Sequence, residues 1–123
     1  MREARTVPGA IDPIGPYSHA VIANGFVFVS GQGPANPQTG EVPELFTEQA
    51  RQTLENIRTI LHGVGLKMHD VVKVQVFLSD LANLPALNEV YREFFPEDYP
   101  VRTTVGAQLL DITVEIDCIA ALG

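Results

Sequence analysis

Residues 18–32, SHAVIANGFVFVSGQ, carry the pattern that decides the fold. Two apolar runs rich in valine and phenylalanine flank the dipeptide Asn24-Gly25. This dipeptide suits a type I′ turn, because both central residues of that turn need a positive φ. We therefore expect an antiparallel hairpin. The following residues 33–44, GPANPQTGEVPE, are rich in turn formers and predict a surface loop.

Two helical segments follow the loop, one at about 47–62 and one at about 84–95. In each segment the apolar residues recur every three or four positions, which indicates one buried helix face. These positions are Ala50, Leu54, Ile57 and Leu61 in the first helix, and Leu84, Leu87, Tyr91 and Phe94 in the second.

Three further segments are expected to be strands: 70–80, 101–107 and 112–121, of which the first and the last alternate between apolar and polar residues. In the first of these we expect two opposite faces, with Val72, Val74, Val76 and Leu78 on one and Lys73, Gln75 and Phe77 on the other. The resulting order β-β-α-β-α-β-β predicts a single α+β domain over residues 1–123, with two helices on one face of a mixed sheet.

The sheet face away from the helices also carries apolar residues. Phe28, Phe77 and Ile119 alternate with positions that already supply the core. Because two helices can cover only one face of a small sheet, this pattern predicts oligomerisation through the other face.

Composition limits the classes of function. The 123 residues are 46% hydrophobic and 19% charged, which is typical of a soluble globular chain. The net charge of −7 and eight scattered basic residues disfavour nucleic acid and anionic membranes as partners. Cys118 is the only cysteine, so no internal disulfide can form. The first ten residues, MREARTVPGA, lack the apolar run of a signal peptide, so we expect a cytoplasmic location.

The stretch YPVRTTVGA, residues 99–107, places a fixed positive charge at Arg102 on a strand. A guanidinium needs a paired or solvated place, and Glu115 is one candidate partner. Glu115 and Asp117 are expected on the sheet face away from the helices. The residues alone favour an ion pair between Arg102 and Glu115 at an interface. The alternative is a clamp that grips a substrate carboxylate, beside a glutamate that orients a water molecule.

Other candidate groups favour structural roles. We expect Tyr17 to be a packing residue just before a strand. Ser30 is not part of a G-x-S-x-G motif, the sequence that places a nucleophilic serine in many hydrolases. Cys118 falls on the core-facing side of its strand and is expected to be buried. The histidines lack the spacing of metal ligands, and two of them are expected at the surface. The three are His19 and the expected surface residues His62 and His69.

Several stretches together resemble one family, the RidA-like (YjgF-type) reactive intermediate/imine deaminases, also known as the L-PSP endoribonuclease family. The stretches cover almost the whole chain in the family's order. They are IGPYSHAV, VFVSGQGPANPQTGEVP, QARQTLENIRTIL, GLKMHDVVKVQVFLSDL, LNEVYREFF, YPVRTTV and VEIDCIA.

The resemblance implies a chorismate-mutase-like fold assembled as a homotrimeric barrel, with clefts between subunits. It implies hydrolysis of 2-aminoacrylate and 2-imino acids to 2-oxo acids and ammonia, with no cofactor and no metal. Arg102 would bind the substrate carboxylate and Glu115 would position water. The residues that would line the substrate site are Tyr17, Ser30, Gly31, Asn88 and Thr104.

The chain departs from the family pattern at four places. His19 replaces a commoner glutamine, Gly33 replaces an apolar residue, and Thr104 replaces a common cysteine. The segment at 106–112 looks about two residues shorter than usual and lacks a Leu-Pro turn. These departures leave the reaction class in place and bear on substrate preference.

Alternatives remain open. One is a related hydrolase, such as a 2-aminomuconate-type deaminase or an aminoacrylate peracid hydrolase. Another is a non-catalytic trimer that binds small acids or acts like a chaperone. A third is the endoribonuclease or translation inhibitor of the older family name, which the acidic charge balance disfavours.

Overall fold

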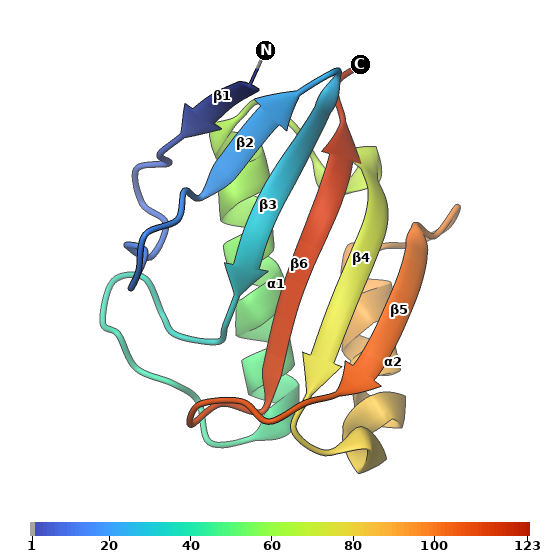
Figure 1. Cartoon of the computed structure of the whole chain (residues 1–123). Coiled ribbons are helices and arrows are strands. Elements are labelled where there is room, and N and C mark those ends of the chain that lie inside the picture. The colour runs from blue at the N-terminus through green and yellow to red at the C-terminus, as the bar shows by residue number, and fades with distance from the viewer. Residues whose placement is uncertain (1) are drawn as a thin grey trace.

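The chain folds into a six-stranded sheet with two helices packed on one face (Figure 1). The computed structural model describes residues 2–123. The strands are β1 (Arg2–Arg5), β2 (Ala20–Ala23), β3 (Phe26–Gln32), β4 (Val71–Leu78), β5 (Val101–Gly106) and β6 (Val114–Ala121). The helices are α1 (Phe46–Gly63) and α2 (Leu84–Phe94), with short 3-10 turns at Met68–Asp70 and Leu81–Asn83.

The sheet order is β1-β2-β3-β6-β4-β5. Strands β4 and β5 run parallel, and the other neighbours run antiparallel. The parallel pair needs a crossover connection, which α2 supplies. The chain therefore has the predicted α+β fold with a mixed sheet, and both helices lie behind it in Figure 1.

The expected hairpin is confirmed between β2 and β3. Asn24 has a φ of 51° and Gly25 a φ of 82°, as a type I′ turn requires. The predicted helix faces are buried as well: Ala50, Leu54 and Leu61 have no exposed surface. Together with Val74 and Ile116 on the sheet, they belong to one continuous core between the helices and the sheet.

One strand was not expected. Strand β1 pairs antiparallel with β2 at the sheet edge, with Arg2 opposite Ala23. Its sequence, REAR, has three charged residues among four and is exposed except at Arg5. It therefore lacks the apolar alternation from which a strand can be predicted.

The prediction that Val72 shares the core face of its strand is wrong. Val72 is 40% exposed, and the pairing of β4 with β6 shifts its register between Val71 and Lys73. This irregularity inserts one residue, so Val71 turns inward in place of Val72. The last strand also begins later than expected, at Val114, because the preceding residues form a loop in which Asp111 has a φ of 60°.

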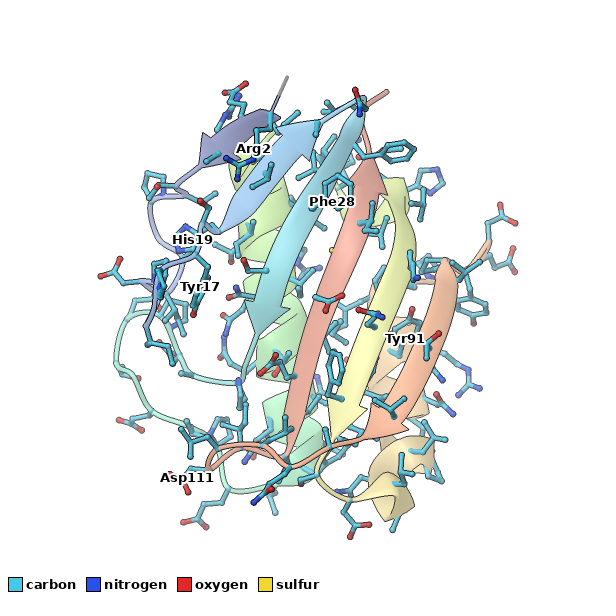
Figure 2. All side chains as sticks on the ribbon, in the orientation of Figure 1. Arg2, Tyr17, His19, Phe28, Tyr91 and Asp111 are labelled. Carbon is cyan, nitrogen blue, oxygen red and sulfur yellow. The ribbon has the colours of Figure 1, made fainter. Side chains whose placement is uncertain are left out.

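The second face of the sheet is not covered by any helix of residues 2–123, and we call it the open face. Phe28 projects from this face and is 44% exposed (Figure 2). Phe26 and Val105 are similarly exposed. Exposed aromatic and aliphatic side chains on one face are typical of a surface that meets a partner. Assembly into a trimer stays a prediction.

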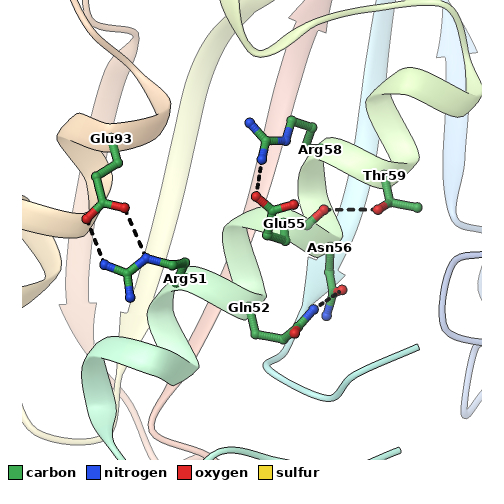
Figure 3. Close-up of polar contacts among 7 residues, drawn as sticks. All are labelled: Arg51, Gln52, Glu55, Asn56, Arg58, Thr59 and Glu93. Atoms are coloured by element: carbon green, nitrogen blue, oxygen red, sulfur yellow. Dashed lines mark hydrogen bonds and ion pairs between the residues drawn. The ribbon is translucent and has the colours of Figure 1, made fainter. Parts of the chain in front are cut away.

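Polar contacts on α1 connect it to its surroundings (Figure 3). Arg51 donates two hydrogen bonds to the carboxylate of Glu93 on α2, at 3.0 and 2.7 Å. Asn56 donates to the carbonyl oxygens of Gly33 and Ala35 at 2.9 and 2.8 Å and thereby fixes the loop after β3. No helix in the described part of the chain is both long and apolar enough to cross a membrane.

Candidate functional site

Arg102 lies on the edge strand β5 and points toward the helices. In the parallel register it is opposite Val74, which is fully buried in the core. Paired residues on neighbouring strands project from the same face, so Arg102 shares the helix side. Its Cζ atom lies 4.8 Å from the centroid of the Tyr91 ring on α2, a cation–π contact.

A cleft of about 290 Å³ surrounds this arginine. Its walls come from α2, from the turn before β5 and from β5 itself. They are Asn88, Tyr91, Arg92, Tyr99, Pro100 and Arg102. Among residues 2–123, the ion pairs are Arg5–Glu3, Arg51–Glu93 and Arg58–Glu55, so Arg102 has no carboxylate partner in the described chain. The cleft can therefore accept an anion.

Tyr91 forms the floor under Arg102. Burial raises the pKa of its hydroxyl to about 12, although the positive charge of Arg102 acts in the opposite direction. The hydroxyl consequently stays protonated at neutral pH. The Tyr91 Oη and Thr104 Oγ1 atoms are both buried and find no hydrogen-bond partner within the described residues. Thr104 lies opposite the buried Val76, so it shares the helix side with Arg102.

Glu115 lies on β6 and points to the open face. Its partner on β4 is Phe77, which alternates with the buried Val76 and Leu78. The carboxylate lies against the backbone of Gly31 on β3, since a Cβ atom at that glycine would be 2.6 Å from Glu115 Oε2. Only a residue without a side chain permits this approach.

A second cavity of about 310 Å³ opens beside this carboxylate. It is lined by Ile14, Tyr17, Ser30, Gly31 and Glu115. The Ser30 hydroxyl donates to the carbonyl of Ser18, and its backbone N–H donates to the carbonyl of His19 at 3.0 Å. Ser30 is therefore held as part of the wall.

His19 fixes the loop that carries Tyr17 (Figure 2). It is only 2% exposed. Its Nδ1 accepts the backbone N–H of Val7 at 2.8 Å, and the opposite nitrogen, Nε2, donates to the carbonyl of Ile11 at 2.7 Å. Both ring nitrogens are thus used to tie three parts of the N-terminal segment together. By contrast, His62 and His69 are exposed, as predicted.

Asp117 follows Glu115 on the same face of β6. Burial raises the pKa of the Asp117 carboxyl, the negative charge of Glu115 raises it further, and Lys73 lowers it. The two carboxylates therefore make this part of the open face electronegative. Cys118 points the other way and is buried as predicted; burial raises the pKa of its thiol to about 12, with a smaller contribution from Asp117.

The structure sorts the predicted site residues into two groups. Arg102, Asn88 and Thr104 lie on the helix side near β5. The second group lies on the open face or at its margin: Tyr17, Ser30, Gly31 and Glu115. The two groups lie on opposite faces of the sheet, so one chain does not bring them together. No group of three or more His, Cys, Asp or Glu side chains in residues 2–123 is arranged to hold a metal ion.

Two features of the site were missed from the sequence. Tyr91 was expected only to pack, and its contact with Arg102 joins segments that the sequence does not connect. The aliphatic walls at Ile14, Leu110 and Ile112 were also missed. Two departures from the family pattern, Gly33 and the shortened segment at 106–112, were the signals that pointed to this region.

Comparison with known proteins adds to this geometry. The family model described as Endoribonuclease L-PSP matches residues 8–122. The chain is 43% identical over 123 residues to TdcF of Escherichia coli, covering 96% of this chain and 93% of that protein. It is 42% identical over 112 residues to the 2-iminobutanoate/2-iminopropanoate deaminase of Escherichia coli, covering 87% of this chain and 88% of that protein.

The fold agrees with a solved structure of one of these relatives. The crystal structure of Escherichia coli TdcF with bound serine superposes with a TM-score of 0.91 at 40% sequence identity. The match covers 97% of this chain and 99% of that one.

Proposed function

The chain belongs to the Endoribonuclease L-PSP (YjgF/RidA) family, and from this premise we propose that it hydrolyses 2-aminoacrylate and 2-imino acids to 2-oxo acids and ammonia. The observation that carries the proposal is Arg102, a guanidinium in an open cleft without an ion-pair partner in residues 2–123. The planar guanidinium group of an arginine binds a small carboxylate through charge-assisted hydrogen bonds. The relative named as an iminobutanoate/iminopropanoate deaminase supports the choice of substrate.

The active site is built from two subunits of a homotrimer. Arg102 and Glu115 face opposite sides of one sheet, so a small substrate can meet both only if they come from different copies. The exposed apolar side chains of the open face, including Phe28 and Phe26, support assembly through that face. In a closed ring, each copy supplies Arg102 to one site and Glu115 to the next.

The reaction needs few protein groups. Arg102 holds the substrate carboxylate, with the backbone N–H of Thr104 beside it, and Asn88 lines the same cleft. The enamine becomes the protonated imine, an iminium ion, by gaining a proton from solvent at C3. Glu115 then orients a water molecule and accepts its proton while the oxygen forms a bond to C2 and the C=N electron pair moves to nitrogen.

The second step releases ammonia. The proton held by Glu115 returns to the nitrogen of the tetrahedral intermediate, the C2–N electron pair leaves with the nitrogen as ammonia, and the hydroxyl oxygen releases its proton to solvent to give the 2-oxo acid. Water supplies the oxygen of the product. Tyr17, Ser30 and Gly31 form the wall against which this water and the imine are held.

Other functions have less support. Ribonuclease activity would require basic residues that track a phosphate backbone, and this chain carries eight basic residues against fifteen acidic ones. A protein that only binds 2-oxo acids would need Arg102 but has no need for a carboxylate held against Gly31.

The proposal is tested by producing 2-aminoacrylate in the cuvette. A PLP-dependent dehydratase acting on serine supplies the enamine, and the acceleration of pyruvate release is measured with this protein added. We expect Arg102→Ala to lower the acceleration at least about tenfold, since a hydrogen bond to a charged group is worth about 1.5–3 kcal/mol. Glu115→Gln should lower it similarly. The proposal is wrong if the wild-type protein gives no acceleration, or if neither substitution alters it.

A further inference from the structure

We propose that a cavity beside Glu115 binds the uncharged aliphatic side chain of the substrate, so that the protein prefers 2-imino acids with branched aliphatic side chains over 2-iminopropanoate. This inference rests on the proposed function. It follows from the walls, the shape and the charges of the cavity.

The cavity extends from the catalytic carboxylate into an aliphatic region. It is a third cavity, of about 270 Å³, which adjoins the cavity of about 310 Å³ described above and shares Glu115, Gly31 and Tyr17 with it. The remaining wall includes four aliphatic side chains from two separate segments: Ile11 and Ile14 before β2, and Leu110 and Ile112 before β6. A substrate whose C2 lies at Glu115 can direct its side chain into this region.

Two of these side chains are unusually exposed. Ile14 is 90% exposed and Leu110 is 84% exposed. Both lie at the margin of the cavity, on loops that approach each other at one end of the sheet. Covering them with an apolar group removes hydrocarbon from water, which favours binding of a larger aliphatic side chain.

Gly33 determines where Ile112 lies in the cavity wall. A Cβ atom at this position would lie 3.2 Å from Cδ1 of Ile112, closer than side chains normally pack. Gly33 does not adopt a positive φ, so the backbone there does not itself require glycine. The absence of a side chain therefore lets Ile112 lie directly against the backbone of Gly33, and a larger residue at position 33 would displace Ile112.

The walls are held in place by α1. Asn56 donates to the carbonyl of Gly33 at 2.9 Å. Gln49 Oε1 accepts the backbone N–H of Thr113 at 3.0 Å and its hydroxyl at 2.7 Å, next to Ile112. Because the Gly33 and Ile112 sides of the cavity are tied to one helix, this part of the cavity is preformed and can discriminate by size.

The charges of the cavity exclude anionic side chains. Its lining contains the carboxylates of Asp12 and Glu115 and, among the described residues, no lysine or arginine. His19 also belongs to the lining, but both its ring nitrogens are engaged with the backbone of Val7 and Ile11. A second carboxylate on the substrate would lie unpaired beside like charges. This disfavours diacids such as the substrate of a 2-aminomuconate-type deaminase.

The first test compares substrates. An amino-acid oxidase produces 2-iminopropanoate from alanine or 2-imino-4-methylpentanoate from leucine, and semicarbazide traps the imine that escapes hydrolysis. A single methylene in an apolar pocket changes kcat/KM by about tenfold or more. We therefore expect the wild-type protein to prefer the leucine-derived imine by at least about tenfold. Equal values of kcat/KM for the two imines would overturn the inference.

Two substitutions test the cavity itself. Gly33→Val displaces Ile112 from its place in the cavity wall, and Leu110→Asp places a charge at the cavity margin without touching the core. Each should lower the ratio of kcat/KM for the leucine-derived imine to kcat/KM for 2-iminopropanoate about tenfold. The matched control is Leu45→Asp, at a leucine that is also exposed but does not line the cavity. The inference fails if both variants keep the wild-type preference. Gel filtration checks that each variant assembles as the wild type does.

A binding measurement separates this inference from the proposed function. Calorimetry compares pyruvate, 4-methyl-2-oxopentanoate and 2-oxoglutarate, which need no hydrolysis. We expect 4-methyl-2-oxopentanoate to bind at least about tenfold tighter than pyruvate, and 2-oxoglutarate to bind more weakly than 4-methyl-2-oxopentanoate. If no imine is hydrolysed but this order holds, the deaminase proposal fails and the cavity assignment stands. If the branched acid binds no tighter than pyruvate, the cavity assignment is wrong.

Discussion

Arg102 and Glu115 project from opposite faces of the same sheet. Arg102 is paired with the buried Val74 and packs on Tyr91, whereas Glu115 is paired with Phe77 on the open face. From their residue types, Arg102 and Glu115 were expected to form an ion pair at an interface. Within residues 2–123 of one chain, the two side chains form no ion pair. Each residue instead belongs to its own cavity.

Gly31 is predicted to control the position of the Glu115 carboxylate. A Cβ atom at this site would lie 2.6 Å from Oε2, so Gly31→Ala must displace the carboxylate or the strand. We expect kcat to fall at least about tenfold, because general-base catalysis depends on placement. The matched control is Gly106→Ala, whose Cβ atom would lie at an ordinary 3.4 Å from Leu81. An unchanged kcat in Gly31→Ala would contradict this role.

Tyr91 is predicted to act through its ring rather than its hydroxyl. The Oη atom is buried without a hydrogen-bond partner in the described chain, while the ring packs under Arg102 and lies 4.6 Å from the Phe95 ring. Tyr91→Phe should therefore raise the free energy of unfolding by about 1 kcal/mol or leave it unchanged, and keep activity. Tyr91→Ala should lower it by about 3–5 kcal/mol.

Urea unfolding of the two variants checks this account of Tyr91. A loss of several kcal/mol in Tyr91→Phe would mean that the hydroxyl has a partner that stabilises the fold.

Stability is predicted to fall in alkali. The folded chain raises the pKa of Tyr91 from 10.0 to about 12 and that of Cys118 from 9.0 to about 12, in both cases mainly through burial. Both groups bind their protons more tightly when folded, so their contribution is complete below about pH 9 and is lost as the pH rises toward 12. In that window each group changes the free energy of unfolding by up to about 1.4 kcal/mol per pH unit.

Urea titrations between pH 7 and pH 11 measure this effect. The double variant Tyr91→Phe, Cys118→Ala removes both groups and should flatten the alkaline limb. A decline of equal steepness in the double variant would assign it to other groups.

Local patterns in the sequence predict much of this fold. Asn24-Gly25 specifies its turn through backbone conformation, and the positions of Ala50 and Leu54 specify a buried helix face, because both depend on neighbours along the chain. Val72 was misplaced because an irregularity depends on the partner strand. The face of Arg102 could not be predicted, since it depends on β4 lying between β5 and β6. For the same reason the sequence could name the site residues but not separate them into two groups.

Mixing two inactive variants tests the central claim, that each site takes Arg102 from one subunit and Glu115 from another. Arg102→Ala and Glu115→Ala subunits are unfolded together in equal amounts, refolded, and assayed with 2-aminoacrylate. In a ring of random composition, a site receives an intact arginine half the time and an intact glutamate half the time, so about a quarter of the wild-type activity should return. Each variant refolded alone is the control and should stay inactive. Activity that stays at the level of the separate variants, in trimers shown by mass spectrometry to contain both, would contradict a site shared between subunits.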